Sequence, residues 1–234
     1  MAIILAGKEG KIGDKAIIVG NLERMKTVTS LLSNAESVNE FAGYYTYTGT
    51  YRDQKVTVTF HGIGNSSLSL IVNDLGSLGA KTIVRFGSAT GISEKADAGT
   101  VVIPTGYSFN IGGFALQELG ELVNFAAVGD VSLIHDLSDR LNKSGIKSVT
   151  GAMFTSDSIH SHDEKMFQKW KSLNHLAIDL EGAGLYFEGV RLGINVASVH
   201  LIYRNVVTKN SMNKEDISKS EKEIAKVILD TITS

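Results

Sequence analysis

Short runs of apolar and β-branched residues, each followed closely by glycine or a polar residue, constrain the fold of this chain most strongly. They are AIIVG at 16–20, KVTVTFHG at 55–62, KTIVRFG at 81–87, TVVIPTG at 100–106 and NVASVHLIY at 195–203. Helical spacing of apolar residues is found at 66–79, 131–142, 163–173, 181–192 and 214–232. Continuous apolar strands that alternate with helices are typical of a sheet covered on both faces. The pattern predicts an α/β fold with a mixed, largely parallel central sheet flanked by helices.

A different pattern occurs in YYTYTGTY, residues 44–51, which predicts an antiparallel strand paired with 55–60 through the turn RDQ. The chain has no Pro/Ser-rich linker, low-complexity stretch or obvious internal repeat, and Pro104 is its one proline. We therefore expect a single domain over residues 1–234.

Charge and cysteine content argue against several kinds of function. Lys and Arg number 23 and Asp and Glu number 25, so the formal net charge of −2 gives no support for a nucleic-acid or membrane-surface partner. The absence of cysteine excludes disulfides, thiolate nucleophiles and Cys-based metal sites. The apolar stretch in MAIILAGKEG is too short for a signal peptide core or a membrane span, so we expect a cytoplasmic protein.

Arginine, glycine and serine gather where the predicted strands end. The first strand ends at Gly20 with Arg24 one turn into a helix, while VRFGSATG carries Arg85 within a strand and Ser88 just after it. A further strand has Arg204 near its carboxyl end, where ligands of open α/β sheets usually bind. An arginine in an apolar strand is costly unless an anion or a carboxylate meets it. These residues predict an oxyanion or phosphate site, although no GxxxxGK[ST] loop occurs.

Two carboxylates, Asp179 and Glu181, stand two residues apart in LAIDLEGAG. Side chains two apart at a strand end point the same way, and one carboxylate can accept two sugar hydroxyls. The alternative is that Asp179 or Glu181 caps the helix that follows. The spacing alone leaves both interpretations open.

Histidines are concentrated in FTSDSIHSHDEK, residues 154–165, which contains His160 and His162. An H-x-H-D run is compatible with a metal site, but loop histidines are more often solvated, so no metal is predicted. His61 lies beside a glycine turn, which it can cap.

Taken in order, the segments IIVGNLER, YTGTYRDQKVTVTFHGIG, LGAKTIVRFGSATG, FTSD and IDLEGAGLYF resemble the purine nucleoside phosphorylase/uridine phosphorylase family, of the hexameric bacterial and archaeal type. The resemblance covers nearly the whole chain and looks closest to archaeal members that act on purine nucleosides and methylthioadenosine. It implies that phosphate attacks the anomeric carbon of a nucleoside, which gives ribose 1-phosphate and a free base. Inorganic phosphate is then the co-substrate, and neither a metal nor an organic cofactor is expected.

The resemblance also implies roles for individual residues. Phosphate binding is implied for Gly20, Arg24, Arg85 and Ser88, and ribose binding for Leu180, which replaces a methionine of the family, and Glu181. Base contacts are implied for Ala89, Thr90, Ile159, Asp179 and Arg204. Glu181 and Arg204 are the candidates for direct catalytic roles, because fixed hydrogen bonds to the sugar let an oxocarbenium-like transition state form against a positioned phosphate.

Several positions depart from the family's pattern. Ile3 stands where a histidine reaches into the neighbouring subunit's site, and Ala42 where an arginine is lent to the neighbour's phosphate. Ile159 replaces the aromatic that stacks on the base, and Thr90 replaces a usual glycine. Arg204 stands where the purine branch has the aspartic acid that protonates the leaving base.

The change at Arg204 has definite chemical consequences. A guanidinium stays charged and cannot hand over a proton, and loss of general-acid help typically costs about 10²–10⁴-fold. Arg204 could instead stabilise negative charge on a departing base. The uridine branch also lacks the aspartic acid and has an Asn-Arg pair here, the reverse of Arg204-Asn205, but 157–165 has no room for its Gln-x-Arg uracil reader. Purine and uridine specificity therefore both stay open.

Two hypotheses follow. The first is an active nucleoside phosphorylase with an altered base pocket. The second is a catalytically weakened paralogue that binds nucleoside or phosphate, or serves as a non-catalytic subunit. A hydrolytic relative is less favoured because the phosphate residues are largely present. The resemblance implies a homo-oligomer, a hexamer built as a trimer of dimers, while a hetero-oligomer with a paralogue would supply the missing histidine and arginine.

Overall fold

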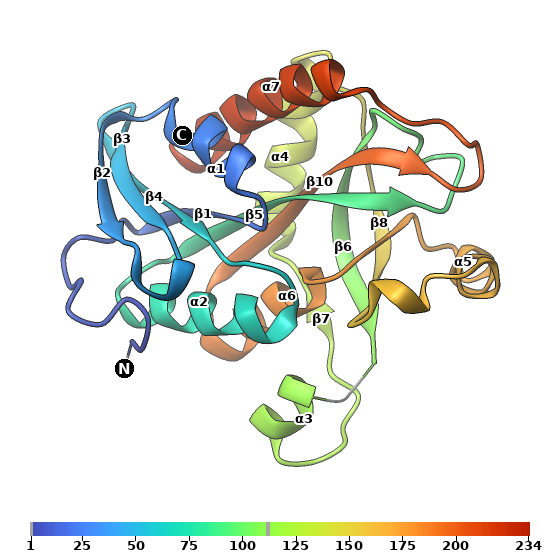
Figure 1. Ribbon diagram of the computed structural model, residues 1–234, viewed down its shortest axis with the longest axis horizontal. Helices are drawn as coiled ribbons and strands as arrows, with labels where there is room; N and C mark the ends of the chain where they lie inside the picture. The colour runs from blue at the N-terminus through green and yellow to red at the C-terminus, as the bar shows by residue number, and fades with distance from the viewer. Residues whose placement is uncertain (1, 111–112) are drawn as a thin grey trace.

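The computed structural model describes residues 2–110 and 113–234, whose strands form one ten-stranded sheet with helices on both faces (Figure 1). The strands are β1 (Lys15–Val19), β2 (Ser33–Asn39), β3 (Thr46–Tyr51), β4 (Gln54–Phe60), β5 (Thr82–Gly91), β6 (Val101–Phe109), β7 (Ala127–Val128), β8 (Ser148–Thr155), β9 (Ala177–Asp179) and β10 (Asn195–Asn205). The α-helices are α1 (Leu22–Thr29), α2 (Asn65–Ser77), α3 (Gly113–Leu119), α4 (Val131–Lys143), α5 (Glu164–Ser172), α6 (Gly182–Leu192) and α7 (Lys214–Ile232). Two 3₁₀ turns, η1 (Phe41–Gly43) and η2 (Ile159–Ser161), complete the description.

The sheet closes on itself over half of its extent. Its order is β10-β6-β8-β9-β5-β1-β4-β3-β2, with β7 beside β6 and an additional pairing between β10 and β5. The strands β5, β10, β6, β8 and β9 therefore make a ring, from which β1 leads out to β4, β3 and β2. Pairing is parallel along β4-β1-β5-β10 and along β6-β8-β9, and antiparallel at the joins between these runs and in the β2–β3–β4 hairpins. The predicted α/β class with a mixed sheet is confirmed.

Successive residues of a central strand point to opposite faces of the sheet and pack into two different hydrophobic clusters. In β1, Ala16 and Ile18 pack in the cluster that includes the apolar faces of α2 and α6, whereas Ile17 and Val19 pack in the cluster that includes α1, α4 and α7. This follows from the two-residue period of a strand, and it explains why the strands are apolar throughout. Figure 1 shows α7 and α4 on one side of the sheet and α2 and α6 on the other.

The predicted antiparallel strand at 44–51 is confirmed as β3, which pairs with β4 so that Tyr51 faces Gln54. Arg52 and Asp53 form the turn with positive φ values of 48° and 60°, the backbone of a tight two-residue hairpin. The strand begins at Thr46 and not at residue 44, because Tyr44 still caps the end of the 3₁₀ turn η1.

The N-terminal segment is tied to α2 by one carboxylate. Asp74 is buried and accepts backbone N–H bonds from Ile3 at 2.8 Å, Ile4 at 2.6 Å and Leu5 at 2.8 Å. Leu5 is buried in the cluster with α2, whereas Ile3 is 68% exposed. Residue 3 is therefore held on the outer surface of the molecule.

No helix within residues 2–110 and 113–234 combines the length and the apolar character needed to cross a membrane.

Candidate active site

The carboxyl ends of β1, β5, β9 and β10 surround a cavity of about 370 Å³. Every residue to which the sequence assigned a phosphate, ribose or base contact lines this cavity: Gly20, Arg24, Arg85, Ser88, Ala89, Thr90, Ile159, Asp179, Leu180, Glu181 and Arg204. The structure thus brings together residues that are far apart in the chain, and their individual roles stay predictions.

Gly20 and Arg24 lie at the end of the cavity formed by β1 and α1. Asn21 begins the helix, since its side chain accepts from the backbone N–H groups of Glu23 and Arg24. A Cβ on Gly20 would lie 3.1 Å from both the Gly62 carbonyl oxygen and Cε1 of His61, so a larger residue would crowd this end.

The Arg24 guanidinium is buried and already has partners. Its Nε donates to Oε1 of Glu221 at 2.7 Å, and Nη2 lies 2.7 Å from the same oxygen. Nη2 also donates to the hydroxyl of Tyr203 at 2.5 Å, and Nη1 to the carbonyl oxygen of Phe86 at 3.3 Å. A carboxylate on α7 therefore neutralises this arginine within the fold.

Arg85 is also buried and meets two carboxylates. Nη1 lies 3.2 Å from Oδ2 of Asp179, and Nη2 contacts Oε2 of Glu181. From the sequence, an anion or a carboxylate was expected beside this arginine, and in the structure the carboxylates of Asp179 and Glu181 lie there. Two histidines complete the surroundings, with Nε2 of His61 at 3.3 Å from Nε and Nδ1 of His200 at 3.4 Å from Nη1.

These two histidines are fully buried. Burial, reinforced by the charge of Arg85, holds the pKa of His61 and of His200 well below the usual value. Both rings are therefore neutral near pH 7 and add no positive charge beside Arg85. The hydroxyl of Tyr107 lies 2.7 Å from Nε2 of His200 and extends this buried polar group into β6.

Of the two carboxylates, Asp179 and not Glu181 makes a side-chain bond to the start of α6. Oδ2 of Asp179 accepts from the backbone N–H of Gly182 at 2.8 Å, so Asp179 caps α6 while it also pairs with Arg85. Glu181 occupies the N-cap position but makes no side-chain cap bond; its Oε1 accepts from the backbone N–H of Gly64 at 3.0 Å. A carboxylate has about four lone-pair sites, so Glu181 can still accept sugar hydroxyls.

Burial raises the pKa of Asp179 to about 6, an effect that Arg85 opposes and Glu181 reinforces. The carboxylate also accepts from the Thr155 hydroxyl at 2.6 Å. Asp179 therefore changes charge close to neutral pH, beside the arginine expected to hold phosphate.

Arg204 and Ile159 line the part of the cavity that β10 and η2 form; the base is expected there, and this part is called the base end. Arg204 follows an irregularity in the pairing of β10 with β5; its side chain is exposed, and Nε lies 3.4 Å from Oγ1 of Thr90. Ile159 is 56% exposed, and as an aliphatic residue it offers no aromatic ring on which a base could stack. His162 also lines this end, and burial together with the Arg204 charge lowers its pKa.

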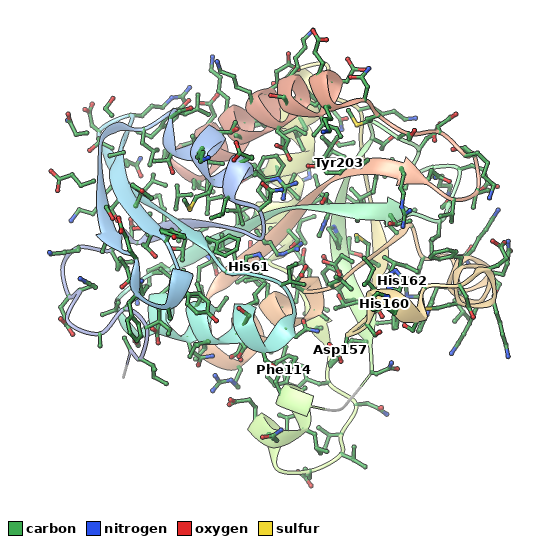
Figure 2. The ribbon with its side chains drawn as sticks, in the orientation of Figure 1. His61, Phe114, Asp157, His160, His162 and Tyr203 are labelled. Carbon is green, nitrogen blue, oxygen red and sulfur yellow. The ribbon has the colours of Figure 1, made fainter. Side chains whose placement is uncertain are left out.

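Some lining residues were missed or assigned otherwise from the sequence. The cavity is also lined by Asn21, Ile63, His162, Ile178 and Tyr203. The sequence left His162 as a solvated loop histidine or, less favoured, a metal ligand, and neither interpretation predicts that it lines the cavity. No group of three or more His, Cys, Asp or Glu side chains in the described part of the chain could hold a metal. His160 is exposed and does not line the cavity, and Figure 2 shows both histidines on the segment before α5. Adjacency to Arg204 was the one sequence signal for Tyr203.

The positions expected to face a neighbouring subunit, Ile3 and Ala42, do not line the cavity. Ala42 lies in η1 with a φ of 54°, a left-handed conformation that is uncommon for a residue with a side chain.

Comparison with known proteins gives one family and several relatives. A family model described as "Phosphorylase superfamily" matches residues 14–233. A protein of Exiguobacterium sp. named purine nucleoside phosphorylase DeoD-type is 31% identical over 233 residues, which cover 99% of this chain and 98% of the relative. A protein of the same name from Caldanaerobacter subterraneus is 26% identical over 232 residues, or 98% of this chain and 99% of the relative. Purine nucleoside phosphorylase DeoD-type 2 of Vibrio cholerae is 27% identical over 224 residues, 95% of this chain and 94% of the relative.

Proposed function

Since this chain belongs to the phosphorylase superfamily, we propose that it cleaves the N-glycosidic bond of a nucleoside with inorganic phosphate, giving ribose 1-phosphate and a free base. The observation that carries the proposal is one cavity at the strand ends that Arg24, Arg85, Glu181 and Arg204 line together. The names of the full-length relatives support the same reaction class.

In the proposed reaction, phosphate lies between the Gly20 backbone, Ser88 and the guanidinium groups of Arg24 and Arg85. Glu181 accepts hydroxyls of the ribose and fixes its anomeric carbon against the phosphate. A phosphate oxygen forms the new bond to that carbon as the glycosidic bond breaks, and the electron pair of the broken bond goes to the base nitrogen. The proposal needs no metal or organic cofactor, because the described residues bind and orient both substrates.

The base end favours a particular kind of leaving group. Arg204 offers several N–H donors and a permanent positive charge, but no acceptor and no transferable proton. Such a group stabilises a base that leaves with negative charge spread onto carbonyl oxygens. We therefore propose a preference for carbonyl-bearing bases, which are 6-oxopurines or uracil, over adenine, whose amino group needs an acceptor.

A substrate panel tests both proposals. The protein is incubated with phosphate and, in turn, inosine, guanosine, uridine, adenosine and methylthioadenosine, and released base and ribose 1-phosphate are measured. Turnover of inosine or guanosine assigns the purine branch, and turnover of uridine the pyrimidine branch. Faster cleavage of adenosine than of inosine, guanosine and uridine would contradict the carbonyl preference.

A second candidate is a weakened paralogue that binds nucleoside or phosphate without turnover, alone or beside an active subunit. It is supported by the carboxylates already bound to Arg24 and Arg85 and by Arg204 at the general-acid position. The same panel separates the two candidates. If no substrate releases its base, but phosphate or a nucleoside raises the melting temperature, the protein is a non-catalytic binder and not an enzyme.

We also propose that the chain forms a hexamer, with a hetero-oligomer that contains a paralogue as the alternative, and that it is located in the cytoplasm. The positions of Ile3 and Ala42 outside the cavity are compatible with a neighbouring subunit nearby. Native mass spectrometry of the purified chain, alone and mixed with a paralogue from the same cell, distinguishes the two assemblies.

A further inference from the structure

Resting on the proposed function, we propose that Glu221 and Tyr203 set the affinity of this site for phosphate by competing with it for Arg24. Both residues lie outside the contacts that the sequence assigned to phosphate. They come from α7 and from the end of β10, and they meet Arg24 on α1. Figure 2 shows Tyr203 beneath α7, on the side of β10 that faces this helix.

The three side chains form a buried cluster. Arg24 is 2% exposed and Glu221 is 7% exposed. Tyr203 donates its hydroxyl hydrogen to Oε1 of Glu221 and accepts from Nη2 of Arg24 at 2.5 Å. Burial raises the pKa of the Tyr203 phenol to about 12, so the phenol keeps its proton and can make this donation at neutral pH.

The donors of Arg24 are nearly exhausted by these contacts. A guanidinium has five N–H groups. The one on Nε and the two on Nη2 face Glu221 and Tyr203, and one on Nη1 reaches the carbonyl oxygen of Phe86. A single N–H on Nη1 remains for a ligand, whereas arginine usually holds phosphate with two parallel N–H bonds. Phosphate must therefore accept one bond from Arg24 or displace Tyr203 or Glu221.

The carboxylates around Arg24 and Arg85 also weaken phosphate binding through their charge. The buried arginines at this end, Arg24 and Arg85, are opposed by the carboxylates of Glu221, Asp179 and Glu181. A phosphate dianion would gain little from cations that are already neutralised, and the Glu221 carboxylate repels it across the arginine. Glu221 itself does not line the cavity, while Arg24 and Tyr203 do, so Glu221 acts on phosphate through them. It is a positioning residue, not one that touches substrate.

The replacement Glu221→Gln separates charge from shape. A glutamine oxygen can still accept from Nε of Arg24, so the guanidinium keeps its place while the negative charge is lost. We expect the dissociation constant of inorganic phosphate, measured by calorimetry, to fall about tenfold. The KM for phosphate should fall in parallel, and the KM for the nucleoside should stay within about twofold of the wild-type value, because Glu221 does not line the cavity and acts through Arg24.

Tyr203→Phe is the second variant, because it removes one hydroxyl and leaves the Arg24–Glu221 ion pair in place. It frees one N–H on Nη2 and should tighten phosphate binding by about threefold. Glu223→Gln is the matched control: it makes the same change two residues along α7 at an exposed position, and phosphate affinity should not change.

The calorimetric constant distinguishes failure of this inference from failure of the proposed function. A protein that turns over no nucleoside but binds phosphate more tightly after Glu221→Gln loses the proposed function and keeps this inference. Unchanged or weaker phosphate binding in Glu221→Gln and Tyr203→Phe overturns the inference, whatever the activity of the wild type.

Discussion

At the scale of single residues, Arg204 matters most for the chemistry. Its side chain is exposed beside Thr90 at the base end of the cavity, and among the described residues it has no ion pair like that of Arg24 with Glu221. The guanidinium can bind an anionic base but cannot protonate one. If the proposed function holds, the identity of this one side chain influences which leaving groups the site assists.

Replacement of Arg204 by aspartic acid is expected to raise cleavage of purine nucleosides at least about tenfold, because a general acid typically contributes 10²–10⁴-fold. The measurement is kcat/KM for inosine and adenosine with saturating phosphate. Arg204→Asn is the control, since it removes the cation without supplying an acid. Equal rates in the two variants would mean that proton donation from position 204 does not limit the reaction.

The sequence could identify the residues expected to bind phosphate, but not the Glu221 carboxylate that pairs with Arg24. Gly20, Arg24, Arg85 and Ser88 were predictable because each lies at the end of an apolar run, where parallel strands place their termini together. Glu221 was not, because it is separated from Arg24 by 197 residues and lies on an amphipathic helix whose pattern explains it equally well as a surface residue. Which carboxylate meets a buried arginine is decided by the packing of elements that the local sequence does not describe.

At the scale of elements, the apolar strands and amphipathic helices were predictable, and the polar or very short elements were not. The helix predicted at 214–232 is α7, with Asn213 as its cap. In contrast, β2 has the sequence SNAESVN with its first five residues exposed, so neither apolar content nor alternation marks it. The short strand β7 exists because the longer strand β6 pairs with it. Tertiary pairing, not local preference, makes these strands.

The segment before β1 depends on a single side chain of α2. Replacement of Asp74 by alanine removes the acceptor of three backbone N–H bonds, and we expect the free energy of unfolding to fall by about 3 kcal/mol. Urea denaturation measures the loss, and hydrogen exchange at residues 3–5 should accelerate. Asp136→Ala at an exposed position of α4 is the control, with an expected loss below about 0.5 kcal/mol. Equal losses in both variants would show that Asp74 does not anchor this segment.

At the scale of the whole molecule, the sheet separates two hydrophobic clusters that are built by different helices. Leu75 of α2 belongs to one and Ile228 of α7 to the other, and both side chains are fully buried. The site lies where strands common to both clusters end, so both faces support it.

Leu75→Ala and Ile228→Ala should each lower the free energy of unfolding by about 2–5 kcal/mol, the usual cost of a cavity in a core. Because the two side chains lie on opposite faces of the sheet, the losses should add in the double variant to within about 0.5 kcal/mol. Chemical denaturation of the two single variants and the double variant gives the coupling energy. A coupling well above that value would mean that the clusters respond as one unit.

The ring formed by β5, β10, β6, β8 and β9 also affects how copies of this chain can associate. Strands within a ring have both neighbours, so they offer no free backbone to another molecule. Among the described strands, the long open edge is β2, where polar exposed residues and two irregularities in its pairing with β3 discourage the addition of a further strand. Sheet extension and edge-to-edge aggregation through β2 are thereby disfavoured, and association of copies through side-chain surfaces is favoured instead.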